Sequence, residues 1–374
     1  MATLRDVAIA AARKLRVALQ EMQIPDTIGM MEITQVYEVS YLASGAFNSV
    51  WLIKLCHPLR IAQPTDINSP QVDAVREFVL RLPYDDALLP NQITNDVAFK
   101  RFIAKTLPHI PVPRVYLYQA TEEAENSFTV EEYINCLPLS STWMSLTDAQ
   151  KENMGQALAE IFIDLAEVRF DMIGGLDPIT QSLAPTVEVG KVCQGRGKFH
   201  RNEWYSIGPY RSTKEYILSC YDREIHYYTH ATDNYIRRFT NKRIQSFTEK
   251  LKQKRATLCA TDMVDEPFVL VHGDFHGRNI LARGDKITAI IDFDFAGSYP
   301  LSEALSCGTI DILECESEES YEEMRIWSQK IRDFIQHEAE KRRWDQSHID
   351  LLMGNQNTEL RKARMEMFPN FGPL

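Results

Sequence analysis

The sequence has few features of a secreted, membrane-spanning or nucleic-acid-binding protein. Its seven cysteines are scattered among 374 residues without a C-x-x-C pair, which argues against a disulfide framework. No apolar run approaches the ~20 residues that a membrane helix requires, so we expect no membrane span. Basic residues are outnumbered, and a net charge of −11 argues against a nucleic-acid partner. These absences indicate a protein of the cytoplasm with reduced thiols.

The first segment gives a second possibility for localisation. Residues 1–30 predict an N-terminal helix, with amphipathic spacing over 2–22 and several basic side chains. A mitochondrial transit peptide has the same character. Asp6, Glu21 and the scarcity of serine favour an ordinary surface helix, and mitochondrial import stays the alternative.

What the chain does contain is a change of pattern near residue 135. Short strand patterns with one internal helix fill residues 31–135, whereas helical spacing dominates 136–374. The proline-containing stretch 56–75 predicts an exposed loop or insertion. No repeat or low-complexity linker separates the two halves. We therefore predict an α+β fold with a β-rich N-lobe over 31–135 and a mainly helical C-lobe over 136–374.

The most informative segment is residues 268–297, FVLVHGDFHGRNILARGDKITAIIDFDFAG. It predicts a buried strand, a polar loop and a tight hairpin. Asp274 and Asn279 stand five positions apart, as in the H-R-D-x-x-x-x-N loop of kinases, and Asp292 ends the hairpin. A carboxylate can orient an acceptor hydroxyl and take its proton, while Asn and Asp supply the oxygen ligands that Mg²⁺ prefers. The spacing therefore indicates ATP-dependent phosphoryl transfer.

The same loop admits two other interpretations. Asp and Asn often stabilise turns, so a hairpin without chemistry would also contain them. His272 and His276 stand four apart, but the glycine between them argues against a helix, and no third His or Cys for zinc is near. We expect His272 to brace the loop and His276 to lie near the reacting phosphate.

HGDFHGRNI followed by IIDFDFAG resembles the aminoglycoside phosphotransferase and choline kinase-like superfamily, and most closely its large fungal branch. The resemblance covers roughly residues 37–305. It implies a protein-kinase-like bilobal fold that uses ATP and Mg²⁺, with Asp274 as catalytic base and Asn279 and Asp292 as magnesium ligands. It also implies a small-molecule hydroxyl acceptor between the catalytic loop and the helical lobe.

The resemblance places the nucleotide in the N-lobe. The turn SGAFNSV then forms the phosphate-covering loop, which consists of Ser44, Gly45, Ala46, Phe47 and Asn48. Kinases bind the α- and β-phosphates with a strand-borne cation that pairs with a helix acid. Arg81 and Asp96 stand at these two places.

Four further residues bear on nucleotide binding. Lys54, on the preceding strand, is a rival phosphate ligand. Glu132 and Ile134 follow in the connector between the lobes and would offer backbone groups to adenine. Glu131 is an unusual residue beside an apolar purine pocket, so the pattern leaves both ATP and GTP open.

The acceptor end gives weaker signals. The basic and aromatic segment 190–211 suits a lid over an anionic acceptor or a solvated loop, and the acidic run 314–319 suits an amine or a helix N-terminus. Outside enzymes, a pseudokinase-like binding module is the alternative, because Arg81, Asp96 and Glu131 depart from the common kinase pattern. A protein kinase is disfavoured, since HGDFHGRN replaces H-R-D-L.

Overall fold

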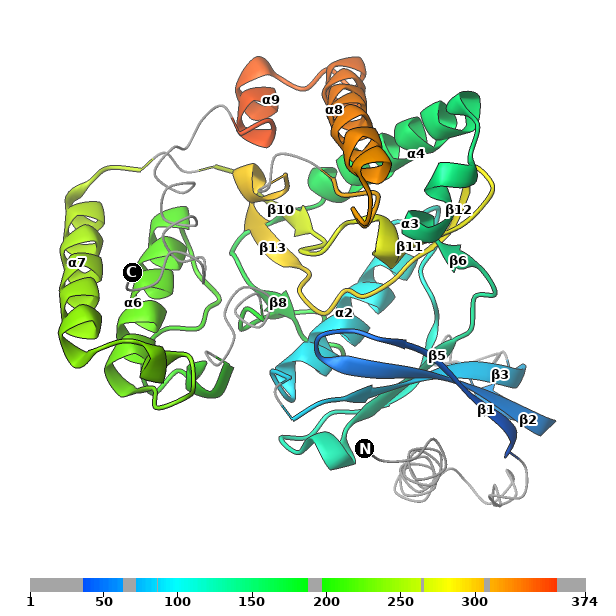
Figure 1. Ribbon diagram of the computed structural model, residues 1–374, viewed down its shortest axis with the longest axis horizontal. Helices are drawn as coiled ribbons and strands as arrows, with labels where there is room; N and C mark the ends of the chain where they lie inside the picture. The colour runs from blue at the N-terminus through cyan, green and yellow to red at the C-terminus, as the bar shows by residue number, and fades with distance from the viewer. Residues whose placement is uncertain are drawn as a thin grey trace.

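The computed structural model describes residues 36–62, 72–85, 87–187, 197–263, 266–305 and 310–354. The helix predicted over 2–22 lies outside these residues. The described chain forms a sheet-rich lobe and a larger helical lobe, joined near residues 132–137 (Figure 1). This arrangement confirms the predicted α+β class.

The N-lobe is built on an antiparallel sheet in the order β1-β2-β3-β5-β4. Its strands are β1 (Val36–Ser44), β2 (Asn48–Ala62), β3 (Val72–Pro83), β4 (Val115–Gln119) and β5 (Phe128–Glu132). Large apolar side chains such as Trp51, Phe78 and Leu80 form its core.

The loop predicted over 56–75 is wrong in its described part. Strands β2 and β3 continue to pair through this stretch, with Leu59 opposite Val75 and Ala62 opposite Val72. The register shifts between Lys54 and Leu59, in the interval that contains Pro58. Proline cannot donate a hydrogen bond to the ladder, but a bulge accommodates it. The strand therefore continues past Pro58, although the turn-forming residues predicted that it would end.

Helix α2 (Asn91–Thr106) lies between the N-lobe sheet and the C-lobe (Figure 1). Its buried side chains Phe99 and Ile103 join Leu270 and Phe293 of the catalytic segment in one apolar cluster. The helix therefore connects the predicted nucleotide end of the molecule to the predicted catalytic loop by direct packing.

The C-lobe consists mainly of helices. They are α3 (Leu139–Thr142), α4 (Asp148–Glu167), α6 (Thr213–His230), α7 (Asn241–Ala260), α8 (Glu318–Lys341) and α9 (Gln346–Leu352). Helix α4 packs on α8, and α6 packs on α7. Ser317 caps α8, so the acidic run lies at a helix N-terminus. No helix among the described residues has the length and apolar character to cross a membrane.

Short strands hold the catalytic segment against this helical layer. Strand β10 (Phe268–Val271) pairs with β13 (Gly297–Pro300) and β7 (Arg169–Phe170). The hairpin of β11 (Ile280–Arg283) and β12 (Lys286–Ile290) pairs with β6 (Leu137–Pro138). The strand, loop and hairpin predicted for residues 268–297 are confirmed. A further small pair is β8 (Gly175–Leu176) with β9 (Leu183–Ala184).

Candidate active site

The loop after β10 holds Asp274 in a fixed position. Its Oδ2 atom lies 3.1 Å from Nε2 of His276 and accepts from Nδ2 of Asn279 at 3.0 Å. The same amide group donates to the backbone carbonyl of Asp274 at 2.9 Å. Because both contacts use the nitrogen of Asn279, its oxygen Oδ1 is the atom suited to a metal ion. The structure thus brings three predicted site residues together.

Two glycines allow this loop to lie close to neighbouring backbone. Gly273 has a φ of +78°, and a Cβ there would lie 2.2 Å from the carbonyl oxygen of Phe295. A Cβ at Gly277 would lie 2.1 Å from the carbonyl oxygen of Ile312. A larger residue at Gly273 would push the catalytic loop away from the segment that contains Asp292, and one at Gly277 would push it away from Ile312.

His272 joins the catalytic loop to the strand before Asp292. Its Nδ1 accepts from the backbone N–H of Asp274 at 3.2 Å, and its Nε2 donates to the carbonyl of Ile291 at 3.1 Å. Its ring lies 4.4 Å from that of Phe293. Both ring nitrogens are engaged, so His272 braces the loop as expected and is not a zinc ligand.

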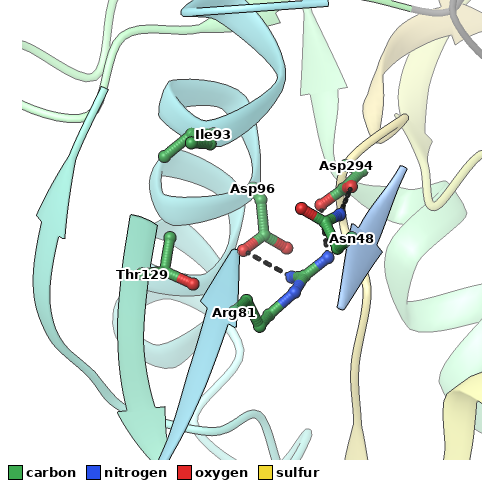
Figure 2. Close-up of a pocket in the computed structure, with 6 residues that line it drawn as sticks. All are labelled: Asn48, Arg81, Ile93, Asp96, Thr129 and Asp294. Carbon is green, nitrogen blue, oxygen red and sulfur yellow. Dashed lines mark hydrogen bonds and ion pairs between the residues drawn. The ribbon is translucent and has the colours of Figure 1, made fainter. Parts of the chain in front are cut away.

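The segment after β12 brings Asp292 to Arg81. Asp292 has a φ of +66°, a left-handed conformation that Asp tolerates better than most residues. Nη2 of Arg81 donates to Asp292 at 2.8 Å and to Asp294 at 2.9 Å. Nη1 donates to Asp96 at 3.2 Å and lies 3.6 Å from Glu131 (Figure 2 shows the contact with Asp96). One guanidinium therefore contacts four carboxylates from three segments, namely α2, β5 and the loop after β12.

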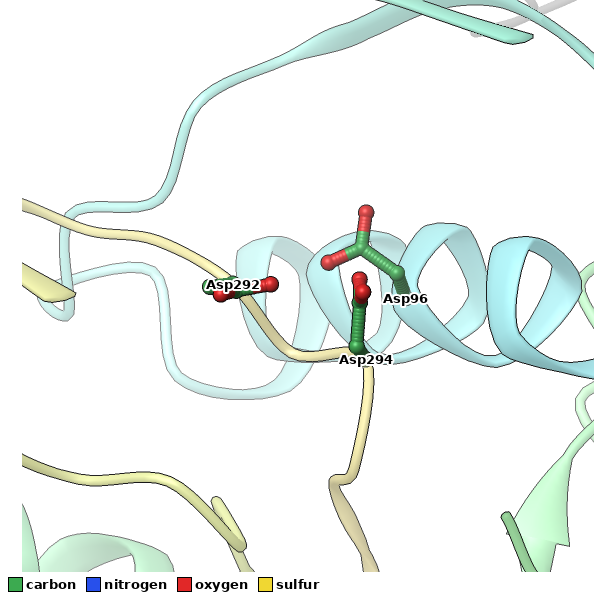
Figure 3. Close-up of side chains that lie close together, drawn as sticks. All are labelled: Asp96, Asp292 and Asp294. Carbon is green, nitrogen blue, oxygen red and sulfur yellow. The ribbon is translucent and has the colours of Figure 1, made fainter. Parts of the chain in front are cut away.

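Asp96, Asp292 and Asp294 lie side by side with oxygens within 4.8 Å of one another (Figure 3). Such a group has the composition of a cation site. The cation among these three carboxylates is the Arg81 guanidinium, which bonds to each of them. The trio is therefore compensated by the protein itself.

Lys100 is the second cation of this group. Its Nζ lies 2.7 Å from Asp96 and 2.7 Å from Glu131, with a side chain only 1% exposed. We call the six residues Arg81, Asp96, Lys100, Glu131, Asp292 and Asp294 the buried charge cluster. Glu131 accepts from Lys100 and from the hydroxyl of Thr129, so its carboxylate is paired within this cluster.

Burial and neighbouring charge act against each other in this cluster. Burial lowers the pKa of Arg81, but the carboxylates, Asp294 first among them, outweigh it and hold that pKa well above its usual value. Burial raises the pKa of Asp294 to about 6 despite the Arg81 charge. Burial also raises the pKa of Glu131, yet Lys100 and Arg81 reverse the shift and lower it to about 2. Arg81 and Glu131 are therefore charged at neutral pH.

The predicted phosphate-covering turn lies against the same cluster. The N–H of Gly45 donates to the carbonyl of Asn48 at 2.9 Å and closes the turn, in which Ala46 is exposed. Nδ2 of Asn48 donates to Asp294 at 3.0 Å. The ring of Phe47 packs edge-on against Phe295, with centroids 5.6 Å apart. Ser44 bonds to Tyr84 at 2.7 Å.

A cavity of about 10 Å³ opens where turn, sheet and helix meet (Figure 2). It has room for about one water molecule. Its lining residues are Asn48, Arg81, Ile93, Asp96, Thr129 and Asp294. The turn predicted to cover phosphates and the cation predicted to bind them thus border one space.

The connector between the lobes carries Glu132 and Ile134. The N–H of Glu132 donates to the carbonyl of Arg114 at 2.8 Å, and the carbonyl of Ile134 accepts from Cys136 at 2.8 Å. These bonds engage the N–H of Glu132 and the carbonyl of Ile134 within the protein.

Two weaker candidates have structural roles. Lys54 pairs with Glu38 of β1 at 3.0 Å, which does not favour it as a phosphate ligand. In the predicted lid, residues 190–196 lie outside the described chain. His200 is buried and lies 2.6 Å from the carbonyl of Thr186, so it packs within the fold.

Two members of the cluster, Asp294 and Lys100, and their neighbour Gln92 were not singled out from the sequence. Asp294 lies in the segment IIDFDFAG, and Lys100 follows Asp96 by one helical turn, a spacing that permits an ion pair. Gln92 donates to Asp294 at 2.6 Å and had no comparable signal.

Comparisons with known proteins give a family. The model of the phosphotransferase enzyme family matches residues 42–307. No curated protein matches the chain.

Among solved structures, aminoglycoside phosphotransferase APH(4)-Ia is 15% identical, with 94% of this chain and 88% of that chain covered and a TM-score of 0.49. A thermostable mutant of it, in complex with AMP-PNP and hygromycin B, is 16% identical, with 89% of this chain and 85% of that chain covered and a TM-score of 0.47. APH(2″)-IIa in a ternary complex with streptomycin and ATP is 16% identical, with 89% of this chain and 92% of that chain covered and a TM-score of 0.40.

The family match spans both lobes and most of the chain, including the turn at Gly45 and the catalytic segment at 268–297. It confirms the resemblance seen in HGDFHGRNI and IIDFDFAG, and the protein-kinase-like bilobal fold that the resemblance implied. The chain belongs to the phosphotransferase enzyme family.

Proposed function

We propose that this phosphotransferase is a cytoplasmic kinase that uses ATP and Mg²⁺ to phosphorylate a hydroxyl group of a small metabolite. The γ-phosphate passes to the acceptor oxygen, ADP is released and the hydroxyl proton goes to Asp274. The observation that carries the proposal is the fixed carboxylate of Asp274, held by Asn279 and His276. Phosphoryl transfer depends on such positioning more than on covalent chemistry.

The catalytic loop supplies the base. The contacts of Oδ2 fix the plane of the Asp274 carboxylate, so an acceptor hydroxyl would meet a preorganised acceptor for its proton. His276 would lie beside the transferred phosphate, where an imidazole N–H can stabilise negative charge.

The donor set fits a magnesium ion. Asn279 would bind through Oδ1, because its nitrogen is engaged by Asp274. Asp292 would bind through its carboxylate, which is 36% exposed and so accessible. When bound, Mg²⁺ neutralises charge that develops on the phosphates. Arg81 would then hold the phosphates, with Asp96 behind it.

The nucleotide would bind in the N-lobe, over residues 31–135, under the turn Ser44–Asn48. Glu132 and Ile134 would offer backbone groups of the connector to adenine. The acceptor would bind to the C-lobe, over residues 136–374, next to the catalytic loop.

One observation favours the second candidate, a pseudokinase-like binding module. Arg81 and Asp292, which a kinase needs for phosphate and metal, are bonded to each other at 2.8 Å. A module without turnover would keep this contact. The retained Asp274, Asn279 and Asp292 argue for the kinase, because a scaffold needs none of them.

The test is a nucleotide-binding measurement followed by a turnover assay. Thermal shift with ATP and Mg²⁺ should show stabilisation of about 2.7 kcal/mol at roughly 100 times Kd. GTP and metal-free samples are the controls. Turnover of hydroxyl metabolites by the wild type, and its loss in Asp274→Ala with nucleotide binding retained, would support the kinase. Binding without any turnover would favour the module, and near-normal kcat in Asp274→Ala would refute the role of that residue.

A further inference from the structure

Lys100 is a buried ammonium that none of the roles above requires. Its side chain is 1% exposed, on the face of α2 that meets the sheet. Burying a charge costs several kcal/mol unless it is well paired, and an apolar side chain would fill the same space without that cost. The placement of Lys100 among functional residues therefore calls for a reason other than packing.

Lys100 and Arg81 bind the same atom. Oδ2 of Asp96 accepts from Lys100 Nζ at 2.7 Å and from Arg81 Nη1 at 3.2 Å. Oδ1 of Asp96 accepts from the backbone N–H of Phe293 at 2.8 Å. The Asp96 carboxylate is thus held by α2, by β3 and by the loop that contains Asp292. Its orientation sets both the guanidinium and that loop.

Glu131 ties Lys100 to the sheet. Its Oε2 lies 2.7 Å from Nζ of Lys100, and its Oε1 accepts from the hydroxyl of Thr129 at 2.8 Å. Thr129 is the register partner of Arg81 across β3 and β5. A closed circuit of contacts therefore runs from Arg81 through Asp96, Lys100, Glu131 and Thr129 back to the strand of Arg81.

Resting on the proposed function, we infer that Lys100 and Glu131 are positioning residues for nucleotide binding. They hold Asp96 in the orientation that aims Arg81 at the phosphates and fixes the loop of Asp292. Neither residue touches the nucleotide in this scheme. A purely structural pair would instead affect stability alone.

The double variant Lys100→Met/Glu131→Met separates these roles. It removes one charge of each sign, so the net charge of the cluster is unchanged, and buried pairs replaced by apolar residues often keep their stability. The matched control is Lys151→Met/Glu323→Met, which removes the largely buried pair between α4 and α8. Calorimetric titration with Mg²⁺ and AMP-PNP gives Kd, and thermal unfolding gives Tm.

We expect the double variant to bind the nucleotide about tenfold more weakly than wild type, at a Tm within a few degrees. The control should bind as wild type does. A double variant that binds as tightly as wild type would overturn the inference. If it does not fold, Glu131→Gln decides, since it removes the carboxylate charge that holds Lys100 and keeps the side-chain volume: weaker binding supports the inference, and unchanged binding overturns it.

A crystal structure of the double variant distinguishes failure of the inference from failure of the proposed function. Absence of Mg²⁺–nucleotide binding in the wild type would refute the proposed function. The contact between Arg81 Nη1 and Asp96 Oδ2, now 3.2 Å, still decides the positioning role. Its loss in the double variant supports the inference, and its retention with unchanged geometry overturns it.

Discussion

Arg81 donates to Asp292 across 2.8 Å, so the predicted phosphate ligand and the predicted metal ligand neutralise each other. Asp292 belongs to a trio of carboxylates whose oxygens lie within 4.8 Å. Nucleotide and Mg²⁺ would have to replace this contact together. The phosphates would then pair with Arg81, and Mg²⁺ would pair with Asp292. Binding of the metal alone should therefore be weak.

Replacing Arg81 tests this relationship. In Arg81→Met the trio loses its guanidinium, and three adjacent carboxylates attract a divalent cation. We expect Mn²⁺ without nucleotide to raise the Tm of Arg81→Met by several degrees and that of wild type by little, while nucleotide affinity falls about tenfold or more. Arg325→Met, on the surface of α8, is the control. Equal Mn²⁺ shifts in all three proteins would contradict the expectation.

Asn279→Asp tests the bond that holds the base. The substitution keeps an oxygen for the metal but replaces the amide donor, now 3.0 Å from Asp274, with a second carboxylate. Repulsion should turn the Asp274 carboxylate, so kcat should fall by about 10² or more while the Mg²⁺ requirement persists. Steady-state kinetics over a range of Mg²⁺ concentrations measures both. Unchanged kcat would show that this contact does not position the base.

The catalytic segment was predictable because its signals are local. Strand pattern, turn glycines and the spacing of Asp274 and Asn279 all lie within residues 268–297, and the structure has the expected strand, loop and hairpin. The N-lobe sheet was predictable for the same reason, apart from 56–75. In that stretch the turn-forming residues predicted a loop, but β2 and β3 pair on both sides of the irregularity that contains Pro58.

The buried charge cluster was not predictable in the same way. Whether Lys100 points to solvent or to Glu131 depends on how α2 packs against the sheet, and residues 31 positions apart carry no local sign of contact. The contact of Arg81 with Asp294 spans 213 positions. Such contacts are set by tertiary packing, which periodicity alone does not encode.

Gly273→Ala tests how closely the catalytic loop must approach its neighbour. The new Cβ would meet the Phe295 carbonyl at 2.2 Å at a φ of +78°, so clash and strain add, and we expect a loss of roughly 3 kcal/mol or more in unfolding free energy. Gly284→Ala is the matched control, because its φ of +61° is similar but no atom lies within 4 Å. It should cost only about 1–2 kcal/mol. Urea unfolding compares them, and equal losses would show that the close approach is unimportant.

Acid unfolding tests the charge on Glu131. Lys100 and Arg81 outweigh burial and lower its pKa to about 2 in the folded protein, against about 4.3 in an unfolded chain. A lowered carboxyl pKa contributes stability that is fully present above the unfolded value and is lost as pH falls from about 4.3 toward 2. Glu131→Gln lacks this contribution. Its unfolding free energy should therefore lie below that of wild type at pH 6, and the gap should close as pH falls through that window. A gap that stays constant from pH 6 to pH 3 would mean that the ionised form of Glu131 contributes nothing to the fold.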